Sequence, residues 1–363
     1  MNIFGITIDH STNYGSAFQA YALQTVINRM TVQGEPCRYR LIPFMKLKGQ
    51  SRDKKWYLMQ PVWIWNRSRF RHFDRKHMKY ADCRHVRELA SLNKTADAFV
   101  CGSDVIWRPD YSKKTQFLLD FAEKYAFSYA ASFGVSEIDE DARKRCGKFL
   151  ARFREIGVRE KSAADIVKAC CGKDAQVVAD PVMMLKREDW EQIAAPAKKE
   201  KPYIFVYETH VTAVIDAFVA RLRQQTGERV VMTVAGPKQA LKKGILQIHS
   251  PEHWLRLLRD ADYVVTNSFH ATVLCLLYHK QFYTVVQGEK EKGINVRMWE
   301  LLEKTGMSAQ LFNETPAQID LSEISFDAVD NKLDALRADS FAFLQRNLDA
   351  AYLEKTQSDI KEN

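Results

Sequence analysis

Short apolar runs alternate with amphipathic stretches along nearly the whole chain. The apolar runs, such as Tyr203-Ile204-Phe205-Val206, are rich in β-branched and aromatic residues and predict strands buried on both faces. We expect strands at 2–8, 36–42, 97–101, 126–131, 155–158, 175–179, 203–207, 229–234, 245–248, 263–266 and 282–286. Between them, helical spacing of apolar residues predicts helices at 16–30, 62–78, 138–153, 161–171, 211–225, 251–260, 268–279 and 293–305.

This alternation is typical of βαβ units, so we expect an α/β fold with mainly parallel sheets. The chain has 363 residues, which is too long for one ordinary core and suits two domains. Two prolines and a run of charges interrupt the pattern between Lys186 and Pro202. We therefore predict an N-terminal domain over 1–185, a linker over 186–202, a C-terminal domain over 203–325, and C-terminal helices over 326–363 that can pack back on the N-terminal domain.

Composition narrows the class of protein. The chain is 46% hydrophobic and 27% charged, which is typical of a globular protein rather than a disordered one. It contains no apolar run long enough to span a bilayer, and its first residues lack the features of a signal peptide. The seven cysteines are scattered and odd in number, which predicts reduced thiols and no zinc site. A cytoplasmic location is expected.

The positive charge is concentrated in residues 45–87, where thirteen Lys and Arg residues accompany only three Asp residues. Aromatic residues are interleaved with these charges, so the segment could contact nucleic acid or rest on an anionic membrane. It could also form a solvated helix with Phe70, Phe73 and His77 packed inward. We favour inward packing for Phe70 and Phe73, keep membrane contact as a hypothesis for the basic face, and expect no nucleic-acid partner. Membrane contact would place the protein at the inner face of the membrane.

Two candidate ligand sites lie in the first half of the chain, each where a strand gives way to a helix. Asn13-Tyr14-Gly15-Ser16 combines a flexible glycine with a serine that can cap a helix start, where an anion is favoured. The same residues also suit an ordinary capped helix. Gly102-Ser103-Asp104 follows a strand, and Asp104 could either orient a sugar hydroxyl or cap local backbone.

Two further junctions carry side chains with stronger chemistry. Arg159 follows a short strand and offers a fork of donors that suits phosphate or carboxylate, although spacing alone favours a surface pair, either with Glu160 or between helices. Ser268 and His270 follow an apolar strand at the expected mouth of the second sheet. Because an imidazole transfers protons near neutral pH, His270 is the strongest catalytic candidate.

Taken in order, these stretches resemble the polysaccharide pyruvyl transferase family, from the N-terminus to about residue 305. The residues that carry the likeness are Asn13-Tyr14-Gly15-Ser16, Gln19-Ala20-Tyr21-Ala22-Leu23, Gly102-Ser103-Asp104 with Trp107, Tyr129-Ala130-Ala131-Ser132-Phe133-Gly134, Arg159-Glu160-Lys161-Ser162, Asp180-Pro181, Ala261-Asp262-Tyr263-Val264-Val265 and Ser268-Phe269-His270.

The resemblance implies a GT-B type architecture of two Rossmann-like domains with the active site between them. It implies transfer of pyruvate from phosphoenolpyruvate to a sugar of a cell-surface glycan or its precursor, which is lipid-linked or free, to form a cyclic ketal. No metal or cofactor is expected beyond this donor. The family's catalytic histidine and arginine correspond to His270 and Arg159. The expected substrate-binding residues are Asn13, Tyr14, Gly15, Ser16, Gly102, Ser103, Asp104, Ser132, Ser268 and Arg297.

The sequence departs from the family pattern at two places. Ser268 stands where some members are thought to use a basic residue. Ala271 stands where glycine is usual, and if that glycine serves close backbone approach, alanine predicts a narrower site or an altered substrate. Two other functions remain open: a glycosyltransferase of the same architecture with a nucleotide-sugar donor, and a noncatalytic glycan- or nucleic-acid-binding protein.

Overall fold

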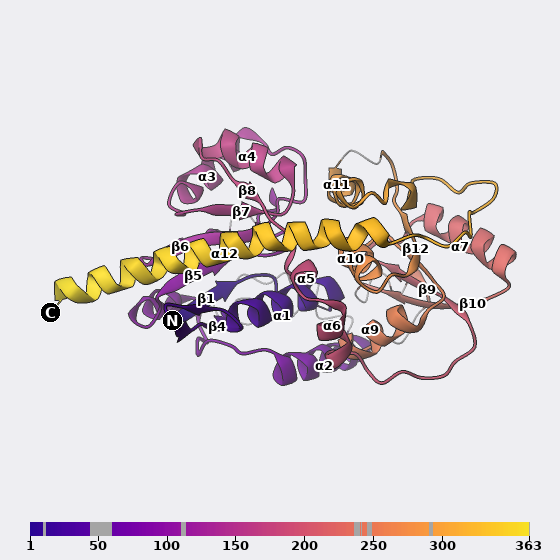
Figure 1. Ribbon diagram of the computed structural model, residues 1–363, viewed down its shortest axis with the longest axis horizontal. Coiled ribbons are helices and arrows are strands. Elements are labelled where there is room, and N and C mark those ends of the chain that lie inside the picture. Colours follow the sequence, from indigo (N-terminus) through magenta and orange to yellow (C-terminus); the bar gives the residue numbers. More distant parts are fainter. Residues whose placement is uncertain are drawn as a thin grey trace.

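The computed structural model describes residues 1–9, 12–43, 60–109, 114–235, 240, 242–244, 249–289 and 293–362. Two parallel sheets organise the molecule (Figure 1). The first has the order β4 (Arg38–Leu41), β1 (Asn2–Ile6), β5 (Ala98–Cys101), β6 (Tyr125–Ala131), β7 (Ile156–Val158) and β8 (Gln176–Val177). The second has the order β10 (Arg229–Val234), β9 (Tyr203–Glu208), β11 (Tyr263–Thr266), β12 (Gln281–Val285) and β13 (Leu311–Phe312).

Helices connect the strands of each sheet and cover its faces. Those of the first half are α1 (Tyr14–Asn28), α2 (Gln60–His77), α3 (Glu140–Leu150), α4 (Lys161–Cys171), α5 (Pro181–Met184) and α6 (Arg187–Ile193). Those of the second half are α7 (Ala213–Thr226), α9 (Pro251–Asp260), α10 (Phe269–Leu277) and α11 (Val296–Thr305). Short elements complete the fold: β2 (Thr31–Val32) and β3 (Glu35–Pro36) form an antiparallel pair, and single-turn or 3₁₀ segments lie at Val86–Lys94, Thr115–Leu118, Gly293–Asn295 and Ser308–Gln310.

Local sequence explains these elements well. All six residues of β9 are buried, as expected for a strand with a neighbour on each side and helices on both faces. α9 begins with Ser250 as the N-cap and Pro251 in the first turn, and it buries Trp254, Leu255 and Leu258 along one side. The predicted α/β class with two Rossmann-like, parallel-sheet domains is therefore confirmed.

The structure departs from the sequence predictions in some short or peripheral segments. β13 was not predicted, because two residues give no periodic signal. The predicted strand 245–248 lies outside the described residues. α6 occupies the first half of the predicted linker because Trp190 is fully buried there, packed against Phe18 and Tyr21.

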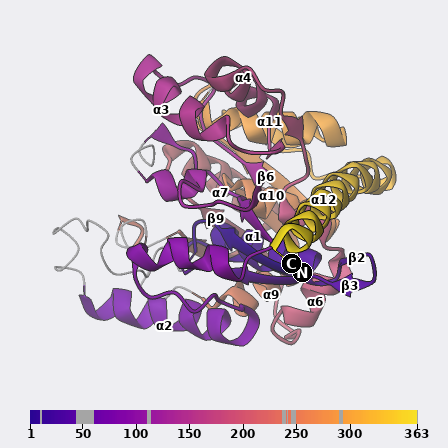
Figure 2. The same ribbon diagram turned by 90° about the vertical axis from the view of Figure 1, so that its left-hand side faces the viewer.

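The C-terminal region forms one long helix, α12 (Asp327–Glu362), instead of several short ones. It runs from the second domain across the first, close to the chain's N-terminus in the view of Figure 2. Leu344 and Leu348 are fully buried in the main core, and Tyr125 of β6 donates a hydrogen bond to Asn347 at 3.2 Å. Among the described residues, no helix has the length and apolarity needed to cross a bilayer.

An aromatic cluster joins the two domains. Tyr14 of α1 stacks on Trp254 of α9 at 5.1 Å between ring centroids and meets the edge of Tyr207 in β9. The Tyr14 hydroxyl donates a hydrogen bond to the backbone oxygen of His249 at 2.8 Å. Phe70 of α2 also contacts Tyr14, and Phe70 and Phe73 are both buried, as the inward packing predicted from sequence requires. The two domains are therefore held together by a buried, mainly aromatic contact.

Candidate active site

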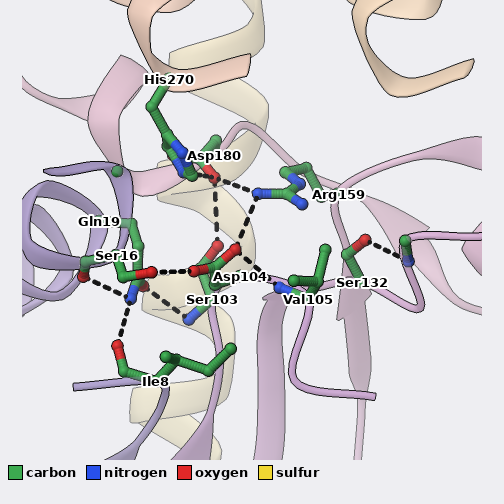
Figure 3. A network of polar contacts seen from close by, with 12 residues as sticks. Ile8, Ser16, Gln19, Ser103, Asp104, Val105, Ser132, Arg159, Asp180 and His270 are labelled. Atoms are coloured by element: carbon green, nitrogen blue, oxygen red, sulfur yellow. Dashed lines mark hydrogen bonds and ion pairs between the residues drawn. The ribbon is translucent and has the colours of Figure 1, made fainter. Parts of the chain in front are cut away.

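Polar side chains from both domains converge beside this interface (Figure 3). Ser103 and Asp104 follow β5, Arg159 follows β7, and Asp180 lies directly before α5. His270 reaches them from the first turn of α10 in the second domain. Because β5 and β7 are parallel, their carboxyl ends lie at one edge of the sheet, which is where ligands bind in such folds.

Asp180 lies at the centre of this network. Its Oδ2 accepts hydrogen bonds from Ser103 Oγ at 3.2 Å and Arg159 Nη1 at 3.1 Å, and it lies 3.5 Å from His270 Nε2. Its Oδ1 accepts from the backbone N–H of Val182 at 3.0 Å, which caps α5. Burial opposes the charged form, but His270 and Arg159 outweigh it and hold the pKa of this carboxyl far below its usual range.

Arg159 is surrounded by carboxylates. Besides Asp180, its Nε donates to Glu160 Oε2 at 3.4 Å, and its Nη1 lies 3.9 Å from Asp104 Oδ1. Burial disfavours its charge, yet the three carboxylates raise its pKa. Its guanidinium also lies 4.7 Å from the Phe269 ring centroid. Within the described residues, Nη2 has no hydrogen-bond partner, so one donor of a fixed cation is left for a ligand.

His270 is also nearly enclosed, with 8% of its surface exposed. Its ring meets Phe269 edge-on at 5.4 Å, and the opposite domain approaches it through Gly15 in the first turn of α1. A Cβ atom at Gly15 would lie 2.1 Å from His270 Nδ1, so only glycine allows this approach. The sequence analysis interpreted Gly15 as a residue with a flexible backbone. The structure shows instead that its missing side chain makes room for the imidazole of His270.

Ser16 and Asp104 link the same α1 turn to the β5 loop. Ser16 Oγ donates a hydrogen bond to Asp104 Oδ2 at 2.7 Å, and Val105 N–H donates to Oδ1 at 2.8 Å. Asp104 has a φ of 77°, a left-handed conformation in which a non-glycine residue needs support from its surroundings. Burial works against its charge, but His270, Arg159 and the Ser16 hydrogen bond lower its pKa, so the carboxylate stays ionised.

Three of the predicted ligand-binding residues, Asn13, Tyr14 and Gly102, make contacts that stabilise the fold around the site. Asn13, and not Ser16, caps α1, because Asn13 Oδ1 accepts from the N–H groups of Gly15 and Ser16 at 2.9 and 3.4 Å. Tyr14 is fully buried between the domains. Gly102 turns the chain at a φ of 126°, where a Cβ atom would lie 2.1 Å from the backbone oxygen of Tyr129.

The remaining predicted residues lie around the network. Ser268 caps α10 by accepting from Ala271 N–H at 3.4 Å. Ala271 itself is fully buried in the main core cluster. Ser132 donates to Glu160 Oε1 at 2.5 Å and thereby holds the carboxylate that contacts Arg159.

Arg297 of α11 provides a second cation. Its guanidinium lies 5.9 Å from the Phe269 ring, and it lines a cavity of about 30 Å³ together with Arg159, Glu160 and Phe269. Burial and the charge of Arg159 lower its pKa to about 10, so it is still charged at neutral pH. Its Nε has no hydrogen-bond partner in the described part of the chain. Two guanidinium groups with unused donors therefore lie against one phenyl ring.

Sequence reasoning missed two members of the network. Asp180 and Glu160 were noticed only as parts of motifs, although both are buried carboxylates that contact Arg159. A signal for Asp180 was present, since an Asp followed by Pro at a helix start must direct its carboxylate to nearby backbone. The arrangement offers fixed cations for an anion and an imidazole for proton transfer. No group of His, Cys, Asp and Glu within the described ranges is arranged to hold a metal ion.

Comparison with known proteins places this geometry in context. The sequence profile described as polysaccharide pyruvyl transferase matches residues 13–287. No curated protein matches the chain. Among solved structures, a putative UDP-N-acetylglucosamine 2-epimerase from Listeria monocytogenes is similar, with 11% identity, a TM-score of 0.51, and 94% of this chain and 89% of that chain covered. This likeness shows the fold, and the predicted GT-B type architecture is confirmed.

Two other solved structures are similar at lower TM-scores. The Staphylococcus aureus protein MnaA, solved with UDP, has 11% identity and a TM-score of 0.49, with 92% of this chain and 86% of that chain covered. An Escherichia coli heptosyltransferase, solved with an ADP-heptose analogue, has 11% identity and a TM-score of 0.40, with 92% of this chain and 99% of that chain covered.

Proposed function

Since the chain belongs to the polysaccharide pyruvyl transferase family and is thus a transferase, we propose that it moves pyruvate from phosphoenolpyruvate to a sugar. The acceptor would be a sugar of a cell-surface glycan or its precursor, and the product a cyclic ketal. The observation that best supports this proposal is that Arg159 and His270, from different domains, contact the same oxygen of Asp180. A cation and a proton carrier are thereby fixed side by side.

The donor's chemistry fits these groups. Phosphoenolpyruvate carries a phosphate and a carboxylate, so its site must supply cations and directed N–H groups. Arg159 Nη2 and Arg297 Nε are such donors, since neither has a hydrogen-bond partner among the described residues. We assign Arg159 to the donor as first cation and Arg297 as second. Because the cavity beside them has room for about one water, donor entry requires these side chains or the domains to move.

Ketal formation needs two additions at the same carbon. The oxygen of one sugar hydroxyl bonds to C2 of the donor while the methylene carbon gains a proton and becomes a methyl group. The oxygen of a second hydroxyl then bonds to C2 as the bond from C2 to the phosphate oxygen breaks, and its proton leaves with inorganic phosphate. His270 is the group placed to accept and return these protons, a role that contributes about two to four orders of magnitude in rate.

The direct test combines the donor with candidate acceptors. The protein is incubated with phosphoenolpyruvate and lipid-linked or nucleotide-activated sugars, and mass spectrometry follows the added pyruvyl group while phosphate release is measured. His270→Ala should abolish both signals and leave the circular dichroism spectrum unchanged. Undiminished turnover by this variant would exclude the role of His270. Release of no phosphate with any sugar would count against the proposed reaction.

A nucleotide-sugar-dependent glycosyltransferase is the second candidate, because the GT-B type fold does not fix the donor. The two donors are distinguished by thermal shift, since a ligand at one hundred times its Kd stabilises a protein by about 2.7 kcal/mol. We expect stabilisation by phosphoenolpyruvate and its loss in Arg159→Ala. Stabilisation by a nucleotide sugar alone would favour the glycosyltransferase.

We also propose that the protein works in the cytoplasm, in peripheral contact with an anionic membrane. Arg71, Arg75 and Lys76 of α2 are exposed, while Phe70 and Phe73 of the same helix face the core. These side chains belong to the described part of the basic segment 45–87, whose residues 45–59 lie outside the described residues. Such a basic face is attracted to anionic headgroups.

Charge reversal tests this contact. Arg71→Glu, Arg75→Glu and Lys76→Glu together should release the protein from vesicles containing phosphatidylserine, and added salt should do the same to the wild type. The matched control reverses Arg143, Lys144 and Lys148, which are exposed on α3. Vesicle binding that is equal in wild type and α2 variant would contradict the contact.

A further inference from the structure

We propose that Asp180 is the positioning residue of this site, which fixes the imidazole of His270 so that Nδ1, and not Nε2, exchanges protons with the reactants. The inference rests on the proposed pyruvyl transfer and adds a residue and an atom to it. It starts from a simple observation: Asp180 is fully buried, so in this conformation its carboxylate reaches a substrate only through its neighbours.

The carboxylate cannot rotate freely. Its Oδ1 is bound to the N–H of Val182, and its Oδ2 accepts from Ser103 Oγ, so both oxygens are held by the first domain's backbone and loop. The direction in which Oδ2 faces His270 is therefore set by the start of α5 and not by the histidine. A partner held in this way can dictate the orientation of the ring that contacts it.

The contact with Asp180 determines which ring nitrogen carries the proton. His270 Nε2 is buried, forms no hydrogen bond within the described residues and lies 3.5 Å from Asp180 Oδ2, which is ionised because its pKa is strongly lowered. An ionised carboxylate only accepts hydrogen bonds, so this contact favours a proton on Nε2 over a lone pair. In the neutral imidazole Nδ1 then carries a lone pair and can take a proton.

Nδ1 lies on the side of the ring that meets the first turn of α1. A Cβ atom at Gly15 would lie 2.1 Å from Nδ1, so the ring packs closely against the glycine backbone there. Glycine therefore lets the first domain approach the ring nitrogen that does not face Asp180, and a reactant reaches this nitrogen through the same movement that donor entry requires. When Nδ1 accepts the proton of a sugar hydroxyl, the ring becomes an imidazolium, and Asp180 stabilises it across the Nε2 contact.

The same carboxylate also orients the cation. Arg159 Nη1 donates to Asp180 Oδ2 at 3.1 Å, which leaves Nη2 as the N–H group without a partner in the described residues. Asp180 thus fixes one free donor and one free acceptor on groups from opposite domains. If Asp180 only capped α5, the bond from Val182 N–H to Oδ1 would be enough. The contacts of Oδ2 with Ser103, Arg159 and His270 therefore indicate a further role.

The test reads the tautomer of His270 directly and needs no donor. Protein labelled with ¹⁵N-histidine is studied by two-dimensional NMR at about pH 8, with His270→Gln used to assign the signal. The wild type should show a protonated Nε2 and a bare Nδ1. In Asp180→Asn this preference should be lost, because an amide can also present N–H groups to the ring.

Kinetics provide the second readout. Asp180→Asn should lower kcat by about 10²- to 10⁴-fold, as loss of the tautomer-fixing carboxylate does elsewhere, and Asp180→Glu should restore part of it. The matched control is Asp139→Asn, because Asp139 caps α3 through the N–H of Ala142 but lies outside this network. The control should keep wild-type kcat and the wild-type tautomer.

The outcomes separate the two proposals. A wild-type His270 with its proton on Nδ1 would overturn the inference even if pyruvyl transfer occurs and even if Asp180→Asn fails to fold. A kcat for Asp180→Asn within threefold of wild type would also overturn it. A protonated Nε2 in a protein that transfers no pyruvate would support the pairing and contradict the proposed reaction.

Discussion

Gly15 illustrates how a single residue shapes this site. It lies in the first turn of α1, in the first domain, yet the atom that its missing side chain accommodates belongs to His270 of the second domain. Ser16, the next residue, donates to Asp104. The first turn of α1 therefore contacts both His270 and the buried carboxylate of Asp104. Its sequence has to satisfy these contacts as well as the capping of the helix.

Gly15→Ala should impair catalysis without loss of helix propensity. Alanine favours a helix over glycine by about 1 kcal/mol. Its methyl group, however, would clash with Nδ1 of His270 and push the imidazole ring away from α1. We expect kcat to fall at least tenfold, measured by phosphate release, with urea unfolding as the measure of stability. Thr25→Ala, on the same helix and far from His270, should turn over normally. Normal turnover by Gly15→Ala would show that the close approach is not needed.

The candidate reactive residues were easier to single out from the sequence than the residues that surround them. His270 stood out because its chemistry is distinctive and it follows a strand, whereas Arg159 was assigned to the site through the family resemblance. Asp180 and Glu160 were not assigned to the site, because their value depends on contacts with segments far apart in the chain, such as Ser103 and Ser132. Local sequence predicts a cap at Asp180, but only the tertiary fold brings its second oxygen to His270.

At the scale of elements, α12 supports the strand that leads to Arg159. Phe343 of this helix packs against Gly157 in β7, where a Cβ atom would lie 2.9 Å from the phenyl ring. Ser340 accepts a hydrogen bond from Ala179 N–H, next to Asp180. The C-terminal helix thus stabilises the backbone on either side of the candidate site, although it carries none of the reactive groups.

Leu348→Ala measures how much α12 contributes to stability. Leu348 is fully buried against the first domain, so its truncation should lower the free energy of unfolding by about 2–5 kcal/mol. Urea denaturation gives this value. Leu353, on the same helix but 58% exposed, is the matched position, and Leu353→Ala should change stability by less than about 0.5 kcal/mol. Equal effects at both positions would mean that α12 does not dock in solution as described.

Element positions were predictable where one pattern dominated. The predicted helices 161–171 and 251–260 match α4 and α9 in full, because apolar spacing agrees there with Gly172 at the end of α4 and with Ser250 and Pro251 at the start of α9. α6 was assigned to the linker, since prolines and charges nearby outweighed one buried tryptophan, Trp190. Local sequence patterns thus predicted the regular elements. They failed at α6, where the packing of one side chain against a distant part of the chain determines the structure.

At the scale of the whole molecule, the two domains complete one site. Arg159 belongs to the first and His270 to the second, and the aromatic contact of Tyr14 with Trp254 holds the domains together beside them. Neither domain alone has both Arg159 and His270.

A crystal structure of the protein with phosphoenolpyruvate, or an unreactive analogue of it, tests the central claim most directly. Our account predicts an anionic group of the donor within about 3 Å of Arg159 Nη2 and the reacting carbons on the Nδ1 side of His270. A donor bound elsewhere, with no contact to Arg159 or His270, would contradict it.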